Sequence, residues 1–175
     1  MVYLANPTAR VSVIAHSFGT FIISQLLETE FDIRFHRVIF CGSVVSYNFP
    51  LENFRSKLAL PLLNEVGTAD IWPAIAESIT FGYGSAGSYG FRRPYVRDRW
   101  HNGASHGFFL TPSFAKDFWV PFLESGIIIP GSDPAEEPSR WVKLISIFKI
   151  KYLFIAAIAT SAVPYVMSLI SRIHL

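Results

Sequence analysis

A serine between two small residues is the first feature of this sequence that could do chemistry. Ser17 lies in Ala15-His16-Ser17-Phe18-Gly19, and the residues two before and two after it are alanine and glycine. In the strained turn that presents a nucleophilic serine between a strand and a helix, small residues at these two positions let the strand and the helix approach closely. Ser17 is therefore a candidate nucleophile.

An acidic side chain is needed to orient a histidine base, because a serine hydroxyl is a poor nucleophile by itself. Asp70 is the candidate acid, since it follows a predicted strand at 60–66 and would lie at the carboxyl edge of the sheet beside Ser17. Asp98 is a weaker candidate because it is flanked by two arginines, which favours a solvated or ion-paired residue. Asp133 is weaker because it lies in a polar linker.

The candidate base is His106, in Ala104-Ser105-His106-Gly107-Phe108. This loop follows the last predicted strand, and its small residues leave the imidazole accessible. His101 is the alternative if that strand ends elsewhere. His16 is too close to Ser17 to fold back as its base, so we expect it to line the pocket or to pack.

Several other kinds of site are not predicted. The five histidines lack matching carboxylate or cysteine spacing, so we expect neither a metal site nor a cofactor. Gly82 to Gly87 fit GxGxxG, but no predicted helix follows to hold a pyrophosphate, which favours a surface loop. A net charge of +2 with 16% charged residues gives no large basic face, so nucleic acid is not an expected partner.

Strands and helices alternate along the chain and predict an α/β fold. Short apolar runs at 10–15, 37–42 and 60–66 are typical of strands in a buried parallel sheet, and a fourth strand is predicted at 95–99. Apolar residues recur at helical spacing from 18 to 29, directly after Ser17. A further helix is predicted at 112–123, with Pro121 near its end or at a kink.

The C-terminal part of the chain differs in composition. We expect a hydrolase-like domain at 1–130, a linker and basic juxtamembrane segment at 131–151, and a transmembrane helix at 152–171, which has no charged residue. The mean hydropathy of +0.35 agrees with such a helix. More basic residues precede the apolar run than follow it, which predicts a single-pass protein with the domain in the cytoplasm.

Three motifs together carry a resemblance to a known family. AHSFG after a β-branched strand, NEVGTADIWP, and ASHGFFL followed by FWVPFLESG are similar to the C-terminal half of bacterial α/β-hydrolases of the lipase or esterase type. The likeness covers about residues 8 to 130. It implies Ser17 as nucleophile, Asp70 as acid, His106 as base and the backbone N–H of Phe18 as an oxyanion donor. It does not imply a particular substrate.

The predicted fold is a partial one, because strands normally precede the nucleophile strand and only nine residues precede Arg10. Our leading hypothesis is a serine hydrolase that cleaves small esters or related acyl substrates through an acyl-enzyme on Ser17, with a second chain supplying the missing strands. The alternative is a non-catalytic, membrane-anchored fragment or interaction module derived from such a hydrolase.

Overall fold

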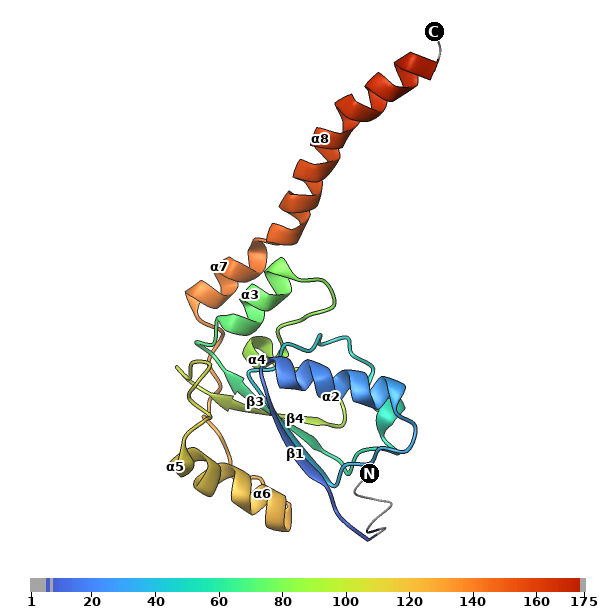
Figure 1. Cartoon of the computed structure of the whole chain (residues 1–175). Coiled ribbons are helices and arrows are strands. Elements are labelled where there is room, and N and C mark those ends of the chain that lie inside the picture. Colours follow the sequence, from blue (N-terminus) through green and yellow to red (C-terminus); the bar gives the residue numbers. More distant parts are fainter. Residues whose placement is uncertain (1–5, 7, 174–175) are drawn as a thin grey trace.

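Four parallel strands form a sheet in the computed structural model, which describes residues 6 and 8–173, with side chains of the last helix described to residue 164. The strands are β1 (Ser12–His16), β2 (Arg37–Cys41), β3 (Leu62–Gly67) and β4 (Val96–His101), in the spatial order β1-β2-β3-β4 (Figure 1). All neighbours pair in parallel, so their carboxyl ends meet at one edge. The predicted α/β arrangement is confirmed as a parallel sheet with flanking helices.

Strand β2 shows why the sheet needs cover on both faces. Val38 and Phe40 belong to one buried apolar cluster, and Ile39 and Cys41 belong to another. Successive side chains of a strand point to opposite faces, so each face of β2 buries apolar surface. The apolar run at 37–42 therefore predicts its own burial correctly.

Three helices lie on one side of the sheet (Figure 1): α2 (Phe18–Thr29), α3 (Trp72–Ile79) and α4 (Ala86–Tyr89). A short 3-10 turn, η1 (Leu51–Phe54), adds Leu51 to the apolar cluster on the same side, together with Leu27 of α2. The bounds of α2 agree with the prediction from its apolar spacing. It therefore begins directly after Ser17 and at the carboxyl end of β1.

The other side is covered by the helical segment at 112–125, which is less regular than predicted. It consists of α5 (Pro112–Phe114), a π-helical turn η2 (Ala115–Trp119) and α6 (Val120–Ser125). The π turn directly precedes the turn that contains Pro121, whose ring cannot occupy the interior of a regular α-helix without displacing the backbone. Phe114, Trp119 and Phe122 pack from this segment into the second apolar cluster.

The segment predicted as a linker is fastened to the sheet domain. Helix α7 (Arg140–Ile147) lies within it, and the Ser139 N–H, just before this helix, donates to the carbonyl of Thr68 at 2.7 Å. Helix α8 (Ile150–Ile173) then projects away from the body (Figure 1). Its base is held by Lys151, whose Nζ donates to the carbonyls of Glu77 and Thr80 at the end of α3.

The prediction of a membrane-spanning helix at 152–171 is wrong for the part of the chain that the structure describes. There, no helix is both long and apolar enough to cross a membrane. The side chains of residues 165–171 lie outside the description. The predicted single-pass localisation, with a cytoplasmic domain, is contradicted with it.

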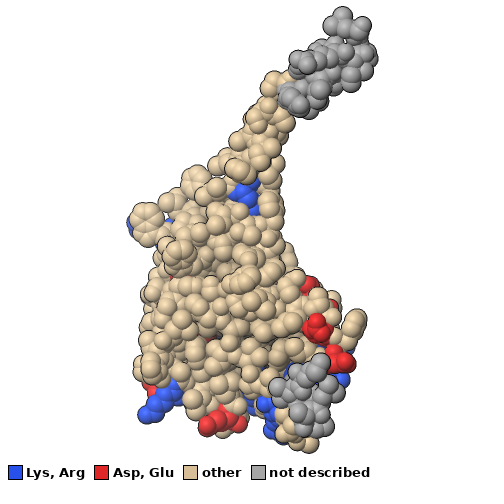
Figure 2. All heavy atoms as spheres, in the orientation of Figure 1, with Lys and Arg blue, Asp and Glu red and all other residues tan. Residues whose placement is uncertain are grey.

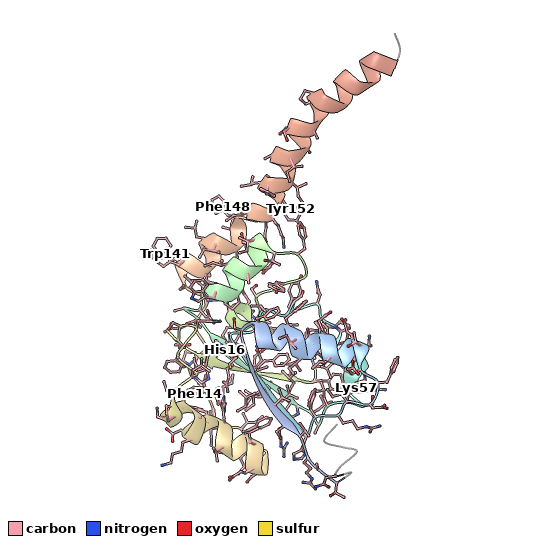
Figure 3. All side chains as sticks on the ribbon, in the orientation of Figure 1. His16, Lys57, Phe114, Trp141, Phe148 and Tyr152 are labelled. Carbon is pink, nitrogen blue, oxygen red and sulfur yellow. The ribbon has the colours of Figure 1, made fainter. Side chains whose placement is uncertain are left out.

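The charged side chains do not form a single basic face on the side of the molecule shown in Figure 2. Most of those visible lie toward the end of the body opposite α8, where Lys and Arg are mixed with Asp and Glu. The side chains of Trp141, Phe148 and Tyr152, by contrast, are exposed on α7, α8 and the turn between them (Figure 3). Exposed apolar side chains thus gather on α7 and at the start of α8.

Candidate active site

Ser17 lies in a sharp turn between β1 and α2. Its backbone angles are φ 53° and ψ −123°, in a region that residues with a side chain rarely adopt. Its N–H donates to the carbonyl of Cys41 at 2.9 Å, and its carbonyl accepts hydrogen bonds from the N–H and hydroxyl of Thr20. A Cβ on Gly19 would lie 3.8 Å from the Cβ of Ala15, which is an ordinary van der Waals distance. The strained turn is therefore present, but this contact would tolerate a methyl group at residue 19.

Asp70 is fully buried just beyond β3, and both its main chain and its side chain are hydrogen-bonded. Its N–H donates to the carbonyl of Gly67 at 3.1 Å, and its carbonyl accepts from the hydroxyl of Ser88 at 2.7 Å. The N–H of Trp72, at the start of α3, donates to Oδ1 of Asp70 at 3.1 Å. These contacts fix the direction of the carboxylate.

His106 lies in the loop after β4, with its ring against Asp70. Nδ1 of His106 is 2.8 Å from Oδ2 and 3.1 Å from Oδ1 of Asp70. An ionised carboxylate can only accept, so Nδ1 carries the hydrogen, and in the neutral ring Nε2 keeps its lone pair. This is the arrangement in which a buried acid orients a histidine base.

The ring of His106 fits into this position because residue 42 is a glycine. Gly42 follows β2 with φ +55°, and a Cβ there would lie 2.8 Å from both Cε1 and Nδ1 of His106. On another side, the ring of Trp72 lies 6.4 Å from that of His106 between centroids. A single added methyl group at residue 42 would therefore displace the imidazole or the turn.

The loops that carry the acid and the base are joined to each other. The N–H of Ala69 donates to the carbonyl of Ala104 at 3.1 Å, and the N–H of Gly103 donates to Oγ1 of Thr68 at 2.8 Å. Thr68 and Ala69 lie between β3 and Asp70, while Gly103 and Ala104 lie between β4 and His106. The relative position of Asp70 and His106 is thus set by main-chain contacts as well as by their own bond.

Ser17 reaches the same edge of the sheet. Its N–H binds Cys41, which precedes Gly42, the residue beneath the ring of His106. Among the described residues, no hydrogen bond joins the Ser17 hydroxyl to His106. Contacts between a catalytic nucleophile and its base are often long without substrate and shorten in the complex. The structure therefore brings Asp70 and His106 into direct contact and leaves Ser17 at the same edge without that bond.

Phe18 is the first residue of α2, so its N–H has no acceptor one turn earlier in the helix. The amino end of a helix carries partial positive charge, which favours a negative group placed beside it. The main chain of Phe18 therefore suits a negative charge that develops next to Ser17.

The alternative candidates have other partners. Asp98 accepts from Nδ2 of Asn64 and from the backbone N–H groups of Phe91 and Arg92, at 2.7 to 3.0 Å, which explains it as a loop anchor rather than an ion pair. His101 binds Glu65 through Nε2 at 2.8 Å. Neither Asp98 nor Asp133 hydrogen-bonds to any histidine among the described residues.

Glu65 forms a second buried cluster that sequence reasoning did not find. Its Oε2 accepts hydrogen bonds from His101 and, at 2.9 Å, from Nε of Arg99. Its Oε1 accepts from Nε1 of Trp119 at 3.0 Å and from Nη2 of Arg99. Burial alone raises the pKa of Glu65, but the hydrogen bonds from Arg99 and His101 lower it below its usual value. An acidic residue within an otherwise buried strand was the available signal.

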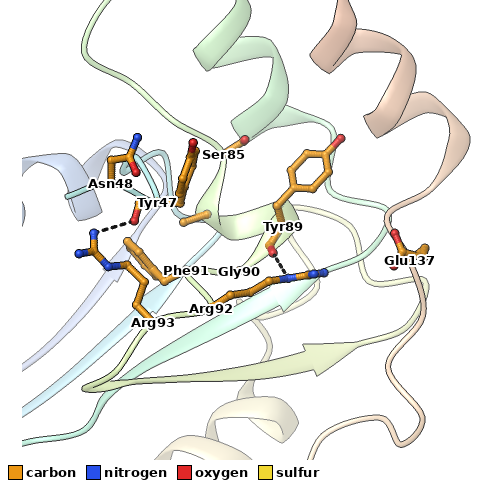
Figure 4. A pocket seen from close by; sticks show the side chains of 10 residues that line it. Tyr47, Asn48, Ser85, Tyr89, Gly90, Phe91, Arg92, Arg93 and Glu137 are labelled. Carbon is orange, nitrogen blue, oxygen red and sulfur yellow. Dashed lines mark hydrogen bonds between the residues drawn. The ribbon is translucent and has the colours of Figure 1, made fainter. Parts of the chain in front are cut away.

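A surface cavity of about 550 Å³ lies apart from these residues (Figure 4). Arg92, Arg93, Tyr47 and Tyr89 line it, but Ser17, Asp70 and His106 do not. One of its charged side chains is already occupied, since Arg93 pairs with Glu52 and also binds backbone carbonyls. This cavity is therefore not formed by the residues that could do covalent chemistry.

Neither a group of metal ligands among the described residues nor a similar protein helps to assign a function to this site. Among the described residues, no group of three or more His, Cys, Asp and Glu side chains could hold a metal ion. No family model matches the chain, and comparisons with curated proteins and with solved structures also give no match. The resemblance to α/β-hydrolases thus stays a prediction, and the assignment of chemistry depends on the geometry.

Proposed function

We propose that this chain is a serine hydrolase of the α/β-hydrolase type that cleaves small esters or related acyl substrates. The observation that carries the proposal is the hydrogen-bonded pair of buried Asp70 and His106 at the same sheet edge as Ser17 in its strained turn. Backbone strain of this kind is concentrated at functional sites. The order of the residues along the chain, serine, acid and then histidine, is that of α/β-hydrolases.

In the proposed reaction, Oγ of Ser17 attacks the acyl carbonyl carbon while Nε2 of His106 takes the hydroxyl proton. The carbonyl oxygen becomes an oxyanion, for which the N–H of Phe18 supplies one donor. Collapse of this intermediate breaks the bond to the leaving group, which receives the proton from His106 and departs as an alcohol. Water then attacks the acyl-Ser17 ester, with His106 again as base, and releases the acid.

Asp70 has a supporting role in this chemistry. Its carboxylate holds the Nδ1–H tautomer of His106 and stabilises the imidazolium that forms after proton transfer. Its burial keeps the two groups together without competition from water. The other contacts of Asp70, with Trp72 and Ser88, hold it in this orientation.

A fluorophosphonate probe tests the proposal directly. We expect the purified chain to be labelled on Ser17, as a mass shift of the peptide that contains it, and to hydrolyse p-nitrophenyl acetate. Ser17→Ala should lose both properties, while Ser56→Ala, at an exposed serine far along the chain, should keep them. Labelling that survives Ser17→Ala, or a folded wild-type chain that is never labelled, would refute the proposal and favour a non-catalytic module.

A further inference from the structure

His16 makes a contact with the candidate base from the other side of the site. It is the last residue of β1, beside the start of α2 (Figure 3). Its Nε2 lies 3.0 Å from the backbone carbonyl oxygen of His106, and the two imidazole centroids are 4.4 Å apart. The loop of His106 is therefore bound from β1 as well as from the segment that carries Asp70.

The direction of this hydrogen bond fixes the state of His16. A carbonyl oxygen only accepts, so Nε2 of His16 must carry a hydrogen and donate it. His106 has the opposite requirement, because its Nδ1 donates to Asp70 and its Nε2 must stay free to accept from Ser17. The two neighbouring rings thus need opposite neutral tautomers.

The surroundings of His16 favour its neutral form. Burial is the main cause that lowers its pKa; the hydrogen bond to His106 raises it, the charge of His106 lowers it and the charge of Asp70 raises it. The net direction is downward, so His16 is uncharged at neutral pH. A neutral His16 ring does not repel the positive charge that His106 acquires when it takes a proton.

We infer that His16 is a positioning residue for the proposed hydrolase reaction, because its Nε2–H holds the main chain of His106 so that the imidazole stays within reach of Ser17. This inference rests on the proposed function. His16 touches neither the reacting atoms nor the oxyanion in this arrangement. It acts through His106, and it links β1, which carries the nucleophile, to the loop that carries the base.

Substitutions of His16 separate its hydrogen bond from its ring. His16→Ala removes the donor, and we expect kcat for p-nitrophenyl acetate to fall about 10- to 100-fold with little change in KM, as for a misplaced catalytic group. His16→Gln keeps an N–H donor at similar reach and should recover most of kcat. His36→Ala, at a histidine outside the site, is the matched control and should match the wild type.

Nitrogen-15 NMR of histidine-labelled protein gives a readout that does not depend on activity. At neutral pH we expect the Nε2–H tautomer for His16 and the Nδ1–H tautomer for His106, with the His16 signals identified by their loss in His16→Gln. The Nδ1–H tautomer of His16, which leaves Nε2 without a hydrogen to donate, would overturn the inference. This measurement stands even where His16→Ala does not fold.

The outcomes also distinguish this inference from the proposed function. An active, probe-labelled wild type with an unimpaired His16→Ala, or with His16→Gln as weak as His16→Ala, overturns the positioning role and leaves the hydrolase intact. A wild type that is folded but unlabelled at Ser17 overturns the function, and the positioning role falls with it. Loss of kcat in His16→Ala with recovery in His16→Gln supports both.

Discussion

Glu65 and His101 form one carboxylate–histidine pair across β3 and β4, and Asp70 and His106 form another just beyond the same two strands. The closest nitrogen–oxygen distance is 2.8 Å in each pair, and the partners are 36 residues apart in each. Both carboxylates are fully buried. Sequence separation and bond length therefore do not distinguish the two pairs.

Their surroundings do. Glu65 shares its oxygens with Arg99 and Trp119, and the His101 side chain is only 7% exposed, with phenylalanine rings packed around it. The His106 side chain is 20% exposed, and its Nε2 has no hydrogen-bond partner among the described residues. The difference indicates that access to solvent, rather than the carboxylate–histidine pair itself, separates a candidate base from a structural histidine.

The largest effect is expected when each histidine is replaced in turn. His106→Ala should lower ester hydrolysis by about 10⁴-fold with little loss of stability, because the base is removed from an accessible position. His101→Ala should retain the rate of the folded fraction but lower the free energy of unfolding by about 2–4 kcal/mol, since it leaves a cavity among aromatic rings and removes a partner of Glu65. Initial rates and urea unfolding measure the two effects.

The comparison of the two histidines fails if the effects are exchanged. A His101→Ala protein that is stable but inactive would make the buried pair the catalytic one. Far-ultraviolet circular dichroism of both variants confirms that rates are compared between folded proteins.

The second effect concerns the buried carboxylate. Glu65→Gln should lower the free energy of unfolding at pH 7 by about 3–5 kcal/mol, because it leaves the positive charge of buried Arg99 without its partner. Glu30→Gln, at an exposed glutamate whose side chain makes no hydrogen bond or ion pair with the described residues, is the control and should change stability by less than about 0.5 kcal/mol. Equal stability of the two variants would contradict a structural role for Glu65.

The pH dependence of stability follows from the same group. The pKa of Glu65 is lower in the folded chain than its usual 4.5, so the folded state releases this proton more readily than the unfolded state. Its contribution to stability is therefore present above about pH 4.5 and is lost as pH falls through the lowered folded value. Between pH 7 and pH 3, the midpoint temperature of thermal unfolding should fall less steeply with pH for Glu65→Gln than for the wild type.

The smallest effect tests how closely the open pair is held. Gly42→Ala should lower ester hydrolysis about 10²-fold, because its methyl group would lie against the ring of His106. Gly103→Ala is a matched control: Gly103 also has a positive φ, of +71°, but a Cβ there meets nothing within 4 Å. Both substitutions strain the backbone, so equal rates in the two variants would show that contact with His106 is unimportant.

The sheet, and the position of the site residues at one of its edges, could be predicted from the sequence because the relevant signals are local. The β-branched run before Ser17 and the apolar spacing after it predict a strand and a helix, and the structure has both. The strand before Asp70 and the loop around His106 likewise place these residues at one edge. Whether they catalyse a reaction stays a prediction.

The remainder depends on contacts between distant residues. Glu65 becomes a buried centre only through Arg99, His101 and Trp119, which lie 34 to 54 residues further along the chain. Helix α7 lies in the basic segment that follows the polar linker, where no helix was predicted. The π turn before Pro121 has no simple sequence signal. The glycine-rich run 82–87 reads as a surface loop, yet a Cβ on Gly87 would meet the N atom of Ser43 at 2.2 Å.

The pairing of β3 with β4 has a consequence for folding. Glu65 lies opposite Arg99 and Gly67 lies opposite His101 in the ladder. A slip of β4 by one residue would turn His101 to the other face of the sheet and displace the following loop by about 3.3 Å. Both carboxylate–histidine pairs would break together, so a misaligned chain could neither bury Glu65 with its partners nor assemble the site. The proposed hydrolase activity would then report on correct strand alignment.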